Sequence, residues 1–193
     1  MVQSARMPEF SLSIPDGDTR ERMVCSACGH VDYRNPKVVV GSVVSHADRV
    51  LLCRRAIEPR RGFWTLPAGY LELDETPEEG ARREAAEEAG AAIVTDGLLA
   101  VFSISRIGQV LMMFRARFAD EGARHRILAG EESLEVGLFA WSEIPWDELA
   151  FPTVRWALEA WRASGDGPLG APAGNPVEDR RGTQRLPLEG ALS

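Results

Sequence analysis

The sequence predicts a mixed α/β (α+β) fold in which a β-sheet lies between helices. Strand-like apolar runs dominate the middle of the chain, one strongly capped helical segment interrupts them, and a second helical segment follows them. The chain of 193 residues is long enough for one packed domain with short appendages.

Composition divides the chain into three regions. Residues 1–36 have little periodic apolar pattern, residues 37–163 contain nearly all strand and helix signals, and residues 164–193 are rich in glycine and proline. The last region contains no aromatic residue and too little apolar surface to offset the entropy lost on ordering. We therefore expect residues 164–193 to be a disordered tail.

The strands are predicted from short runs of β-branched and apolar residues. Their ranges are 38–45, 50–55, 63–66, 98–107, 110–118 and 136–141. His46–Arg49 and Gly108–Gln109 lie between successive runs and are expected to be hairpin loops. A helix over residues 153–163 is expected to close the folded region.

The first helix has clear start and stop signals. Thr76 suits the N-cap, Pro77 suits the first helical position, and Glu79 is spaced to complete a capping box. The helix is expected to continue to Ala89, because Gly90 is suited to the left-handed conformation that ends helices.

Charge and apolar patterning limit the partners and the compartment. A net charge of −7 argues against a broad nucleic-acid-binding face, although a metal ion or local arginines can still hold an anionic nucleotide. No run reaches the roughly 18 apolar residues of a membrane span, and no apolar secretion signal is visible at the start. Three cysteines suit reduced thiols, so we expect a cytoplasmic protein without membrane contact.

The first helix carries an unusual acidic edge. Ala81, Ala85 and Ala89 form an apolar stripe, and Glu84 and Glu88 border that stripe one turn apart. An acidic helix face is usually a solvated surface, but like charges beside a core need a counter-charge such as a hard cation. Helix geometry alone leaves both interpretations open.

The spacing around this helix is more specific. Gly69, Glu75 and the run Arg83-Glu84-Ala85-Ala86-Glu87-Glu88-Ala89-Gly90 match the fixed positions of the Nudix box. The chain therefore resembles the Nudix hydrolases. Ala85 and Ala91 depart mildly from the pattern, because the family usually has larger aliphatic residues there.

The resemblance extends over roughly residues 12–160. The runs YRNPKVVVGSVV, LLCRRAIEPRRGFWTLPAGYLEL and LFAWSEIPWDELAFP look like a Nudix subgroup that carries an N-terminal zinc ribbon. This subgroup is similar to the plant chloroplast FAD and ADP-ribose pyrophosphatases. The resemblance implies the Nudix fold, a mixed sheet sandwiched between helices, and a homodimer is common in the family.

The resemblance also implies roles for the box residues. It implies that Glu84, Glu87 and Glu88 ligate Mg²⁺ or Mn²⁺, with a carbonyl contributed by Gly69. Arg83 would orient these carboxylates by ion pairing, and Glu75 would brace the box loop. Family members often recruit a further acid from a downstream loop, and Glu135 is the candidate here, with an exposed surface acid as the alternative.

Residues that precede and follow the box suggest substrate contacts. Arg54, Arg55, Arg60 and Arg61 supply local positive charge that suits phosphate groups, with solubilising loop charge as the alternative for at least two of them. We select Arg54 and Arg61 as phosphate ligands. Trp64 and Tyr70 are candidates for base stacking, although an aromatic residue beside a strand is more often part of the core.

The N-terminal segment contains half of a zinc site. Cys25 and Cys28 have the Cys-x-x-Cys spacing, but Gln3 and Arg6 occupy the region where the subgroup has its first cysteine pair. His30 lies too close to Cys28 to close a tetrahedral site easily. We expect a degenerate ribbon over residues 1–36 without structural zinc.

Together these features predict a Mg²⁺-dependent pyrophosphohydrolase. Its substrate would be a nucleoside diphosphate linked to another group, such as FAD or ADP-ribose, and its products a nucleoside monophosphate and a second phosphate. Two alternatives remain: a hydrolase that removes damaged nucleoside triphosphates, and a non-catalytic domain that senses a nucleotide.

Overall fold

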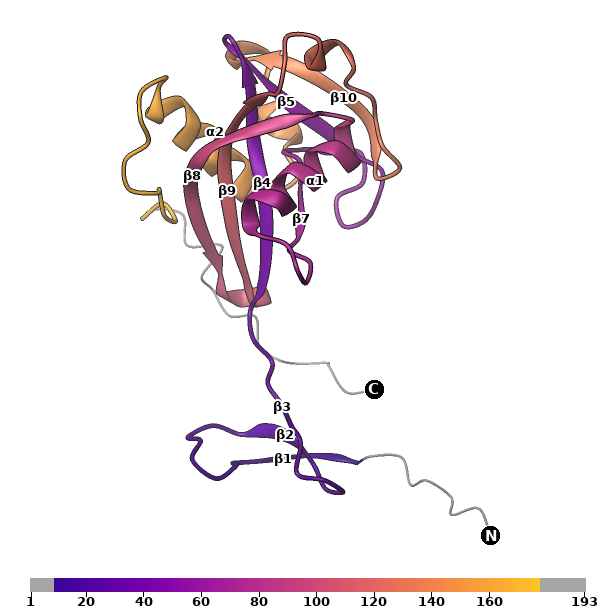
Figure 1. Cartoon of the computed structure of the whole chain (residues 1–193), viewed down its shortest axis with the longest axis vertical. Coiled ribbons are helices and arrows are strands. Elements are labelled where there is room, and N and C mark those ends of the chain that lie inside the picture. Colours follow the sequence, from indigo (N-terminus) through magenta and orange to yellow (C-terminus); the bar gives the residue numbers. More distant parts are fainter. Residues whose placement is uncertain (1–8, 178–193) are drawn as a thin grey trace. The chain divides into compact units, whose positions relative to one another are not determined.

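The computed structural model describes residues 9–177, which form two units that divide between Pro36 and Lys37. The first unit is a small antiparallel sheet with the strand order β1-β2-β3 (Figure 1). Its strands are β1 (Phe10–Ser13), β2 (Arg22–Cys25) and β3 (Val31–Asp32).

The two N-terminal thiols lie at the end of β2, where Cys25 is its last residue, and in the turn that follows, which contains Cys28. The Cys25 N–H donates to the His30 carbonyl at 2.8 Å, and the Gly29 N–H donates to the Cys25 carbonyl at 2.8 Å. Cys25 is buried and Cys28 is exposed, and both are free thiols. Backbone N–H groups of Ala27 and Cys28 lower the pKa of the Cys25 thiol, because they stabilise a thiolate.

The second unit is built on a seven-stranded mixed sheet with the order β10-β5-β4-β9-β8. The short strand β6 pairs with β5, and β7 pairs with β4. Only the β4–β9 pairing is parallel among the described strands of this sheet. The strands are β4 (Lys37–His46), β5 (Arg49–Arg55), β6 (Trp64–Thr65), β7 (Ala68–Tyr70), β8 (Ile93–Ile104), β9 (Gln109–Phe118) and β10 (Ser133–Ala140).

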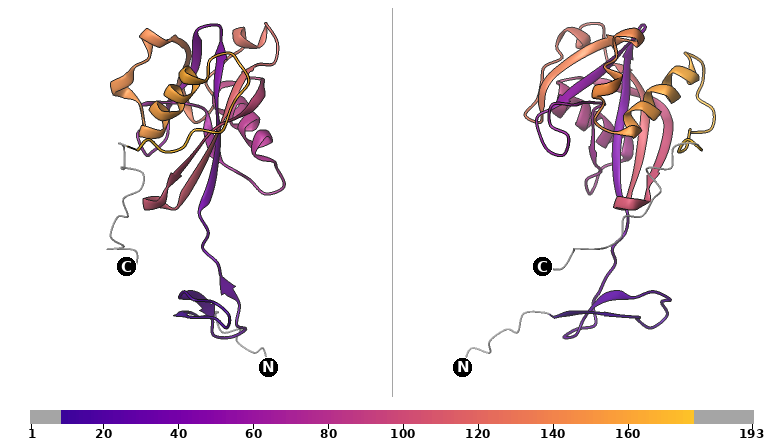
Figure 2. Two further views of the ribbon diagram at one scale, coloured as in Figure 1. Left: turned by 90° about the vertical axis from the view of Figure 1, so that its left-hand side faces the viewer. Right: turned by 180° about the vertical axis from the view of Figure 1, so that it is seen from behind.

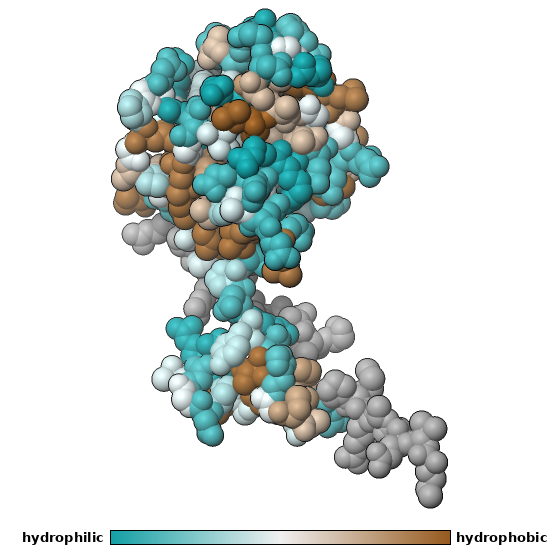
Figure 3. Space-filling view, viewed as in Figure 1, coloured by the Kyte–Doolittle hydropathy of each residue, from teal (hydrophilic) through white to brown (hydrophobic). Residues whose placement is uncertain are grey.

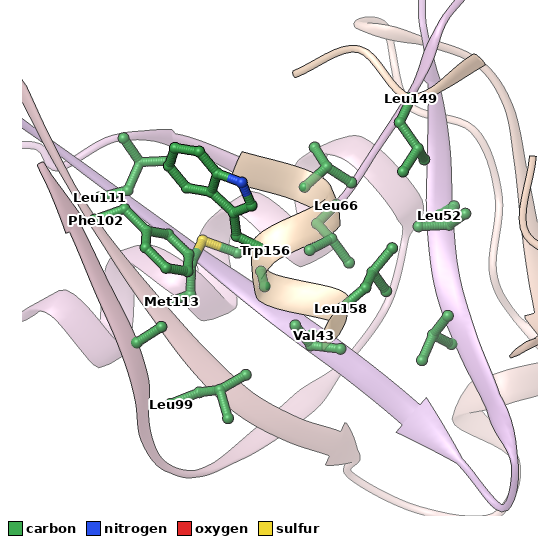
Figure 4. Close-up of a cluster of buried hydrophobic side chains, with 14 of the residues drawn as sticks. Val43, Leu52, Leu66, Leu99, Phe102, Leu111, Met113, Leu149, Trp156 and Leu158 are labelled. Carbon is green, nitrogen blue, oxygen red and sulfur yellow. The ribbon is translucent and has the colours of Figure 1, made fainter. Parts of the chain in front are cut away.

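The two α-helices cover opposite faces of this sheet (Figure 2). One face packs on α1 (Pro77–Ala89), where Leu51 and Cys53 meet Ala85. The other face packs on α2 (Pro152–Ser164), where Trp156 lies among apolar side chains of β8 and β9 (Figure 4). The mixed sheet between helices confirms the predicted fold class. No helix within residues 9–177 is long and apolar enough to cross a membrane.

Helix α1 confirms the predicted caps. The Thr76 hydroxyl accepts the Glu79 N–H at 3.3 Å, and the Glu79 carboxylate accepts the Thr76 N–H at 2.8 Å. Pro77 is the first helical residue, and Gly90 adopts a left-handed conformation with φ of 60°. These caps fix where the helix begins and ends. They therefore determine which of its carboxylates face the sheet.

Two differences from the predicted strands bear on the site. β8 begins at Ile93 and ends at Ile104, and a 3-10 turn over Ser105–Ile107 replaces the predicted end of the strand. The short strand β7 was not predicted as a strand. It forms because its backbone pairs with β4, with Gly69 opposite Val40. Neither the 3-10 turn nor β7 has a periodic apolar pattern from which it could be predicted.

The described part of the C-terminal tail corrects the prediction of disorder from residue 164. Ser164 belongs to α2, and Ala173 pairs with Ala100 of β8. Backbone pairing to the edge of the sheet orders the segment despite its glycine and proline content, because the edge strand offers N–H and C=O groups that need partners. The rest of the predicted tail, residues 178–193, lies outside the described residues, as do Gln3 and Arg6.

Candidate active site

Arg83 lies at the centre of the acidic site. Its guanidinium donates to both oxygens of Glu75, with Nε at 3.0 Å and Nη2 at 2.7 Å. Its Nη1 contacts Glu84 at 2.6 Å and Glu87 at 3.0 Å, and its Nη2 donates to the Tyr70 carbonyl at 3.0 Å. One arginine therefore ties the helix carboxylates to the loop that precedes the helix.

These contacts change the acidity of both partners. The Arg83 hydrogen bond is the main cause that lowers the pKa of Glu75 to about 2, assisted by the Glu72 N–H. The same hydrogen bond raises the pKa of Arg83 above its ordinary value. Both groups are therefore charged across the working pH range, and their bidentate geometry fixes the guanidinium plane.

Glu84 and Glu88 are buried, with exposed fractions of 8% and 6%. Burial is the main cause that raises the pKa of Glu88 to about 8, and the charge of Glu84 adds to it. The only described hydrogen bond to the Glu88 carboxylate comes from the Ala68 N–H at 3.3 Å. Burial also raises the pKa of Glu84. Two adjacent buried acids with few donors form a site that a cation would stabilise.

Gly69 makes room for the Glu84 carboxylate. A β-carbon at position 69 would lie 2.5 Å from the Glu84 Cδ and 2.6 Å from its Oε2, which is closer than real contacts allow. Any larger residue at this position would push the end of the Glu84 side chain away from where it lies. The glycine of the box is therefore explained by packing against the acid that it adjoins.

A loop before β10 closes over the end of α1. The Leu128 N–H donates to the Ala89 carbonyl at 2.9 Å, and the Gly130 N–H donates to the Glu88 carbonyl at 3.1 Å. These donors satisfy carbonyls that a helix end leaves unpaired. The next two residues, Glu131 and Glu132, thereby reach the cavity that contains Glu84 and Glu88.

This acidic cavity has a volume of about 780 Å³. It is lined by Arg83, Glu84, Glu87 and Glu88 of α1, together with Gly69, Tyr70, Glu131 and Glu132. In the space-filling view, hydrophilic residues gather over the region of α1 (Figure 3). The charge of Glu132 raises the pKa of both Glu84 and Glu88. Neither Glu131 nor Glu132 was predicted as a site residue, although Glu132 lies only three residues before Glu135.

Glu135 does not reach the cavity, which corrects the prediction of its role. It lies on β10 opposite Arg54 of β5, and its carboxylate is 3.6 Å from the Arg54 Nη1. The two side chains are about half exposed. Glu135 and Arg54 therefore pair with each other across the sheet. Arg54 also donates to the Gly62 carbonyl at 2.9 Å, so it is a bracing residue outside the cavities.

A second, largely apolar cavity of about 550 Å³ adjoins the acidic one. The two cavities share Val39, Arg55, Pro59, Ala68 and Phe151 as lining residues. Leu111 and Met113 of β9 and Trp156 of α2 are among its lining residues. Figure 4 shows these three side chains together in the core. A ligand with one anionic and one apolar part can therefore span both cavities.

The arginines at this junction are not the predicted pair. Arg55 lines both cavities, and its Nε donates to the Pro59 carbonyl at 2.9 Å. Arg60 lines the apolar cavity, and its Nε donates to the Ala150 carbonyl at 3.1 Å. Arg61 is exposed and lines neither of these two cavities. Adjacent arginines alternate in direction along a strand, so sequence alone does not separate Arg54 from Arg55.

The two aromatic candidates have different positions. Tyr70 lines the acidic cavity, and its hydroxyl accepts the Gln109 amide at 3.1 Å. Trp64 is only 7% exposed and packs edge to face on Phe139, with ring centroids 4.8 Å apart. Trp64 is therefore a core residue, which corrects its prediction as a base-stacking surface.

The donor set of the acidic cavity suits a hard divalent cation. Carboxylate oxygens are the ligands that Mg²⁺ and Mn²⁺ prefer, and the buried, poorly hydrogen-bonded Glu88 lacks a full counter-charge. Within residues 9–177, no three His, Cys, Asp or Glu side chains form a preformed metal cluster. Arg83 Nη1 lies between Glu84 and Glu87 and donates to both carboxylates.

A capped helix that sets three glutamates and an arginine against a mixed sheet defines a hydrolase domain of the Nudix class. The chain belongs to the NUDIX family. The NUDIX domain matches residues 35–159, and the Nudix N-terminal domain, a zinc ribbon, matches residues 8–34.

Three relatives are informative. The crystal structure of a NUDIX hydrolase from Nitrosomonas europaea is 44% identical, with a TM-score of 0.78, over 89% of this chain and 94% of that one. A MutT-like protein from Streptomyces ambofaciens is 44% identical over 79 residues, or 41% of this chain and 49% of that protein. An ADP-ribose pyrophosphatase from Methanocaldococcus jannaschii is 29% identical over 119 residues, which cover 62% of this chain and 69% of that protein. The chain thus spans about half the length of the MutT-like relative.

Proposed function

We propose that this protein is a Mg²⁺-dependent pyrophosphohydrolase that cleaves a nucleoside diphosphate linked to another group. The observation that carries the proposal is the junction of an acidic cavity with an apolar one. A diphosphate suits the first cavity and a nucleobase suits the second. Arg55 lies between them, where a phosphate next to the nucleoside would sit.

The side chains divide the chemical work. Glu84, Glu87 and Glu88 would hold the divalent cation, which neutralises the diphosphate and lowers the pKa of the attacking water. Arg83 pairs with Glu84 and Glu87 through its Nη1 and keeps both carboxylates beside the cavity. Glu132 lines the same cavity and is a carboxylate that can accept the water proton. Arg55 and Arg60 supply positive charge on the side of the apolar cavity.

The apolar cavity favours a nucleotide substrate over inorganic pyrophosphate. Leu111, Met113 and Trp156 offer an apolar floor, and Gln109 and Arg106 add polar groups that can distinguish bases. The ADP-ribose pyrophosphatase relative supports ADP-ribose as the first substrate to test. FAD has the same adenosine diphosphate part and is the second.

The test is a substrate screen with Mg²⁺ present. Purified protein is assayed on ADP-ribose, FAD and a set of ordinary and oxidised nucleoside triphosphates. We expect hydrolysis of at least one diphosphate-linked substrate to a nucleoside monophosphate. The Glu88→Gln variant should lose at least about 100-fold of this activity, whereas Glu78→Gln, an exposed acid on the same helix, should retain it.

Two outcomes would select the alternatives. Turnover confined to triphosphates would reject the proposal in favour of a hydrolase of damaged nucleotides. Absence of turnover, with equal binding of ADP-ribose by the wild type and Glu88→Gln, would indicate a nucleotide sensor. The homodimer expected from the family stays a prediction, which sedimentation equilibrium would test.

A further inference from the structure

The C-terminal segment after α2 lies along β8, the edge strand of the seven-stranded sheet (Figures 1 and 2). The Ala173 N–H donates to the Leu99 carbonyl at 3.0 Å, and the Ala173 carbonyl accepts the Val101 N–H at 2.8 Å. Leu169 and Ala173 also pack against the main core cluster. The segment therefore adds a short parallel pairing to an otherwise open edge.

Asn175 completes this pairing with its side chain. Its Oδ1 accepts the Ser103 N–H at 2.8 Å, and its Nδ2 donates to the Ser103 carbonyl at 2.9 Å. A single amide group thus satisfies both backbone groups of one residue, as a neighbouring strand would. Pro176 follows directly and has no N–H, so regular strand pairing does not continue through its nitrogen.

The position of this contact connects the tail to the apolar cavity. Ser103 is followed by Ile104, the last residue of β8, and then by the 3-10 turn Ser105–Ile107. Ile104, Arg106 and Ile107 all line the apolar cavity. The Asn175 contact is therefore one residue away from the cavity wall.

The far end of the same turn is anchored independently. The Gly108 carbonyl accepts the Lys37 N–H from the start of β4 at 2.8 Å. Gly108 itself is left-handed, with φ of 63°. The turn that lines the cavity is thus held at its Gly108 end by β4. At its other end β8 pairs with β9, through Ile104 and Gln109, and Asn175 adds two hydrogen bonds to the outer edge at Ser103.

We propose that Asn175 is a positioning residue for the apolar cavity, and that the C-terminal segment thereby sets the affinity for the nucleoside part of the substrate. The identity of that ligand rests on the proposed function. The acidic cavity is not involved, because none of its lining residues contacts the segment through a described hydrogen bond.

The test compares Asn175→Ala with Val177→Ala, a control two residues away whose side chain is 86% exposed. We expect Asn175→Ala to raise KM for ADP-ribose roughly 3–10-fold, the range for losing one or two neutral hydrogen bonds. Its kcat should stay within about twofold, because chemistry occurs in the other cavity. Val177→Ala should match the wild type in both constants.

Amide hydrogen exchange gives a readout that does not depend on turnover. Asn175→Ala should exchange faster than the wild type at Ile104–Ile107, with exchange in α1 unchanged. An unchanged KM, or a kcat that falls as much as KM rises, would overturn the proposal. If the wild type hydrolyses none of the nucleotides, the proposed function fails separately. In that case, unchanged exchange at the turn in Asn175→Ala overturns the positioning role, and faster exchange supports it.

Discussion

Arg83 binds Glu75 with two parallel hydrogen bonds, from Nε at 3.0 Å and Nη2 at 2.7 Å, across eight residues of sequence. This pair joins the middle of α1 to the loop that precedes the helix. Because the same guanidinium also contacts Glu84 and Glu87, its orientation determines where the acids of the site lie.

The Glu75–Arg83 ion pair should make the free energy of unfolding depend on pH in the acidic range. The folded-state pKa of Glu75 is about 2, below its ordinary value of 4.5. Its contribution is therefore complete above pH 4.5 and is lost as the pH falls towards 2. We expect Glu75→Gln to be less stable than the wild type at pH 6, with the difference shrinking by pH 2. Urea unfolding across this range measures it, and a difference that grows in acid would contradict the assignment.

Glu88 should have the opposite effect in protein kept free of divalent metal. Its folded-state pKa is about 8, above the ordinary 4.5, so its contribution to stability is complete below pH 4.5 and is lost as the pH rises through 8. Glu88→Gln removes this loss. In EDTA, we expect the variant to exceed the wild type in free energy of unfolding by roughly 1–4 kcal/mol at pH 9 and by much less at pH 5. Equal stability at both pH values would show that Glu88 is not buried as described.

Two glycines of the site should respond differently to alanine. In Gly69→Ala the new β-carbon meets only the end of the Glu84 side chain, which can move aside. We therefore expect a stability change below about 1 kcal/mol but a loss of roughly 10–100-fold in activity, since Glu84 is displaced. In Gly130→Ala the β-carbon meets backbone, 2.9 Å from the Glu87 carbonyl carbon, and should cost about 1–3 kcal/mol. Gly167→Ala, with open space around it, is the control.

Replacing Arg55, which lies where the two cavities meet, should reduce activity much more than replacing the exposed Arg61. Arg55→Ala removes a charge that lies in both cavities, and kcat/KM should fall roughly 10–100-fold, as for loss of a charged hydrogen bond. Arg61→Ala should stay within about twofold of the wild type. Steady-state kinetics on the substrate identified by the screen decides between them. Equal losses in the two variants would indicate a diffuse electrostatic effect.

The N-terminal cysteine pair should hold little zinc. Two thiolates, from Cys25 and Cys28, leave half of a tetrahedral site without protein ligands. Elemental analysis of purified protein is expected to give well below one zinc per chain. Near-stoichiometric zinc that disappears in Cys25→Ser would contradict this prediction and would assign a complete site to the unit.

Local sequence patterns were sufficient for α1 and for much of the sheet. The capping residues Thr76 and Glu79 interact only with their near neighbours, so their spacing predicts the helix start that the structure confirms. The box spacing likewise directed attention to Glu84 and Glu88, because residues four apart on a helix lie on one face.

Other assignments failed where the answer depended on distant backbone. Glu132 was not predicted as a site residue, because the sequence does not show that the Gly130 N–H binds the end of α1 and so places the following acids, Glu131 and Glu132, at the cavity. Arg54 was chosen over Arg55 because the face of β5 that meets the cavity is set by pairing with β10.

The sequence by itself determined a capped acidic helix, a sheet around it and the family to which the chain belongs. Only the tertiary structure decided that Glu132 lines the acidic cavity, that Arg55 lines both cavities and that Trp64 lies in the core. The physical reason is the separation in sequence of the residues that interact. Helix caps and helical spacing depend on contacts between residues only a few positions apart. The cavity walls are set by strand pairings and hydrogen bonds that join residues such as Ser103 and Asn175, which are 72 positions apart.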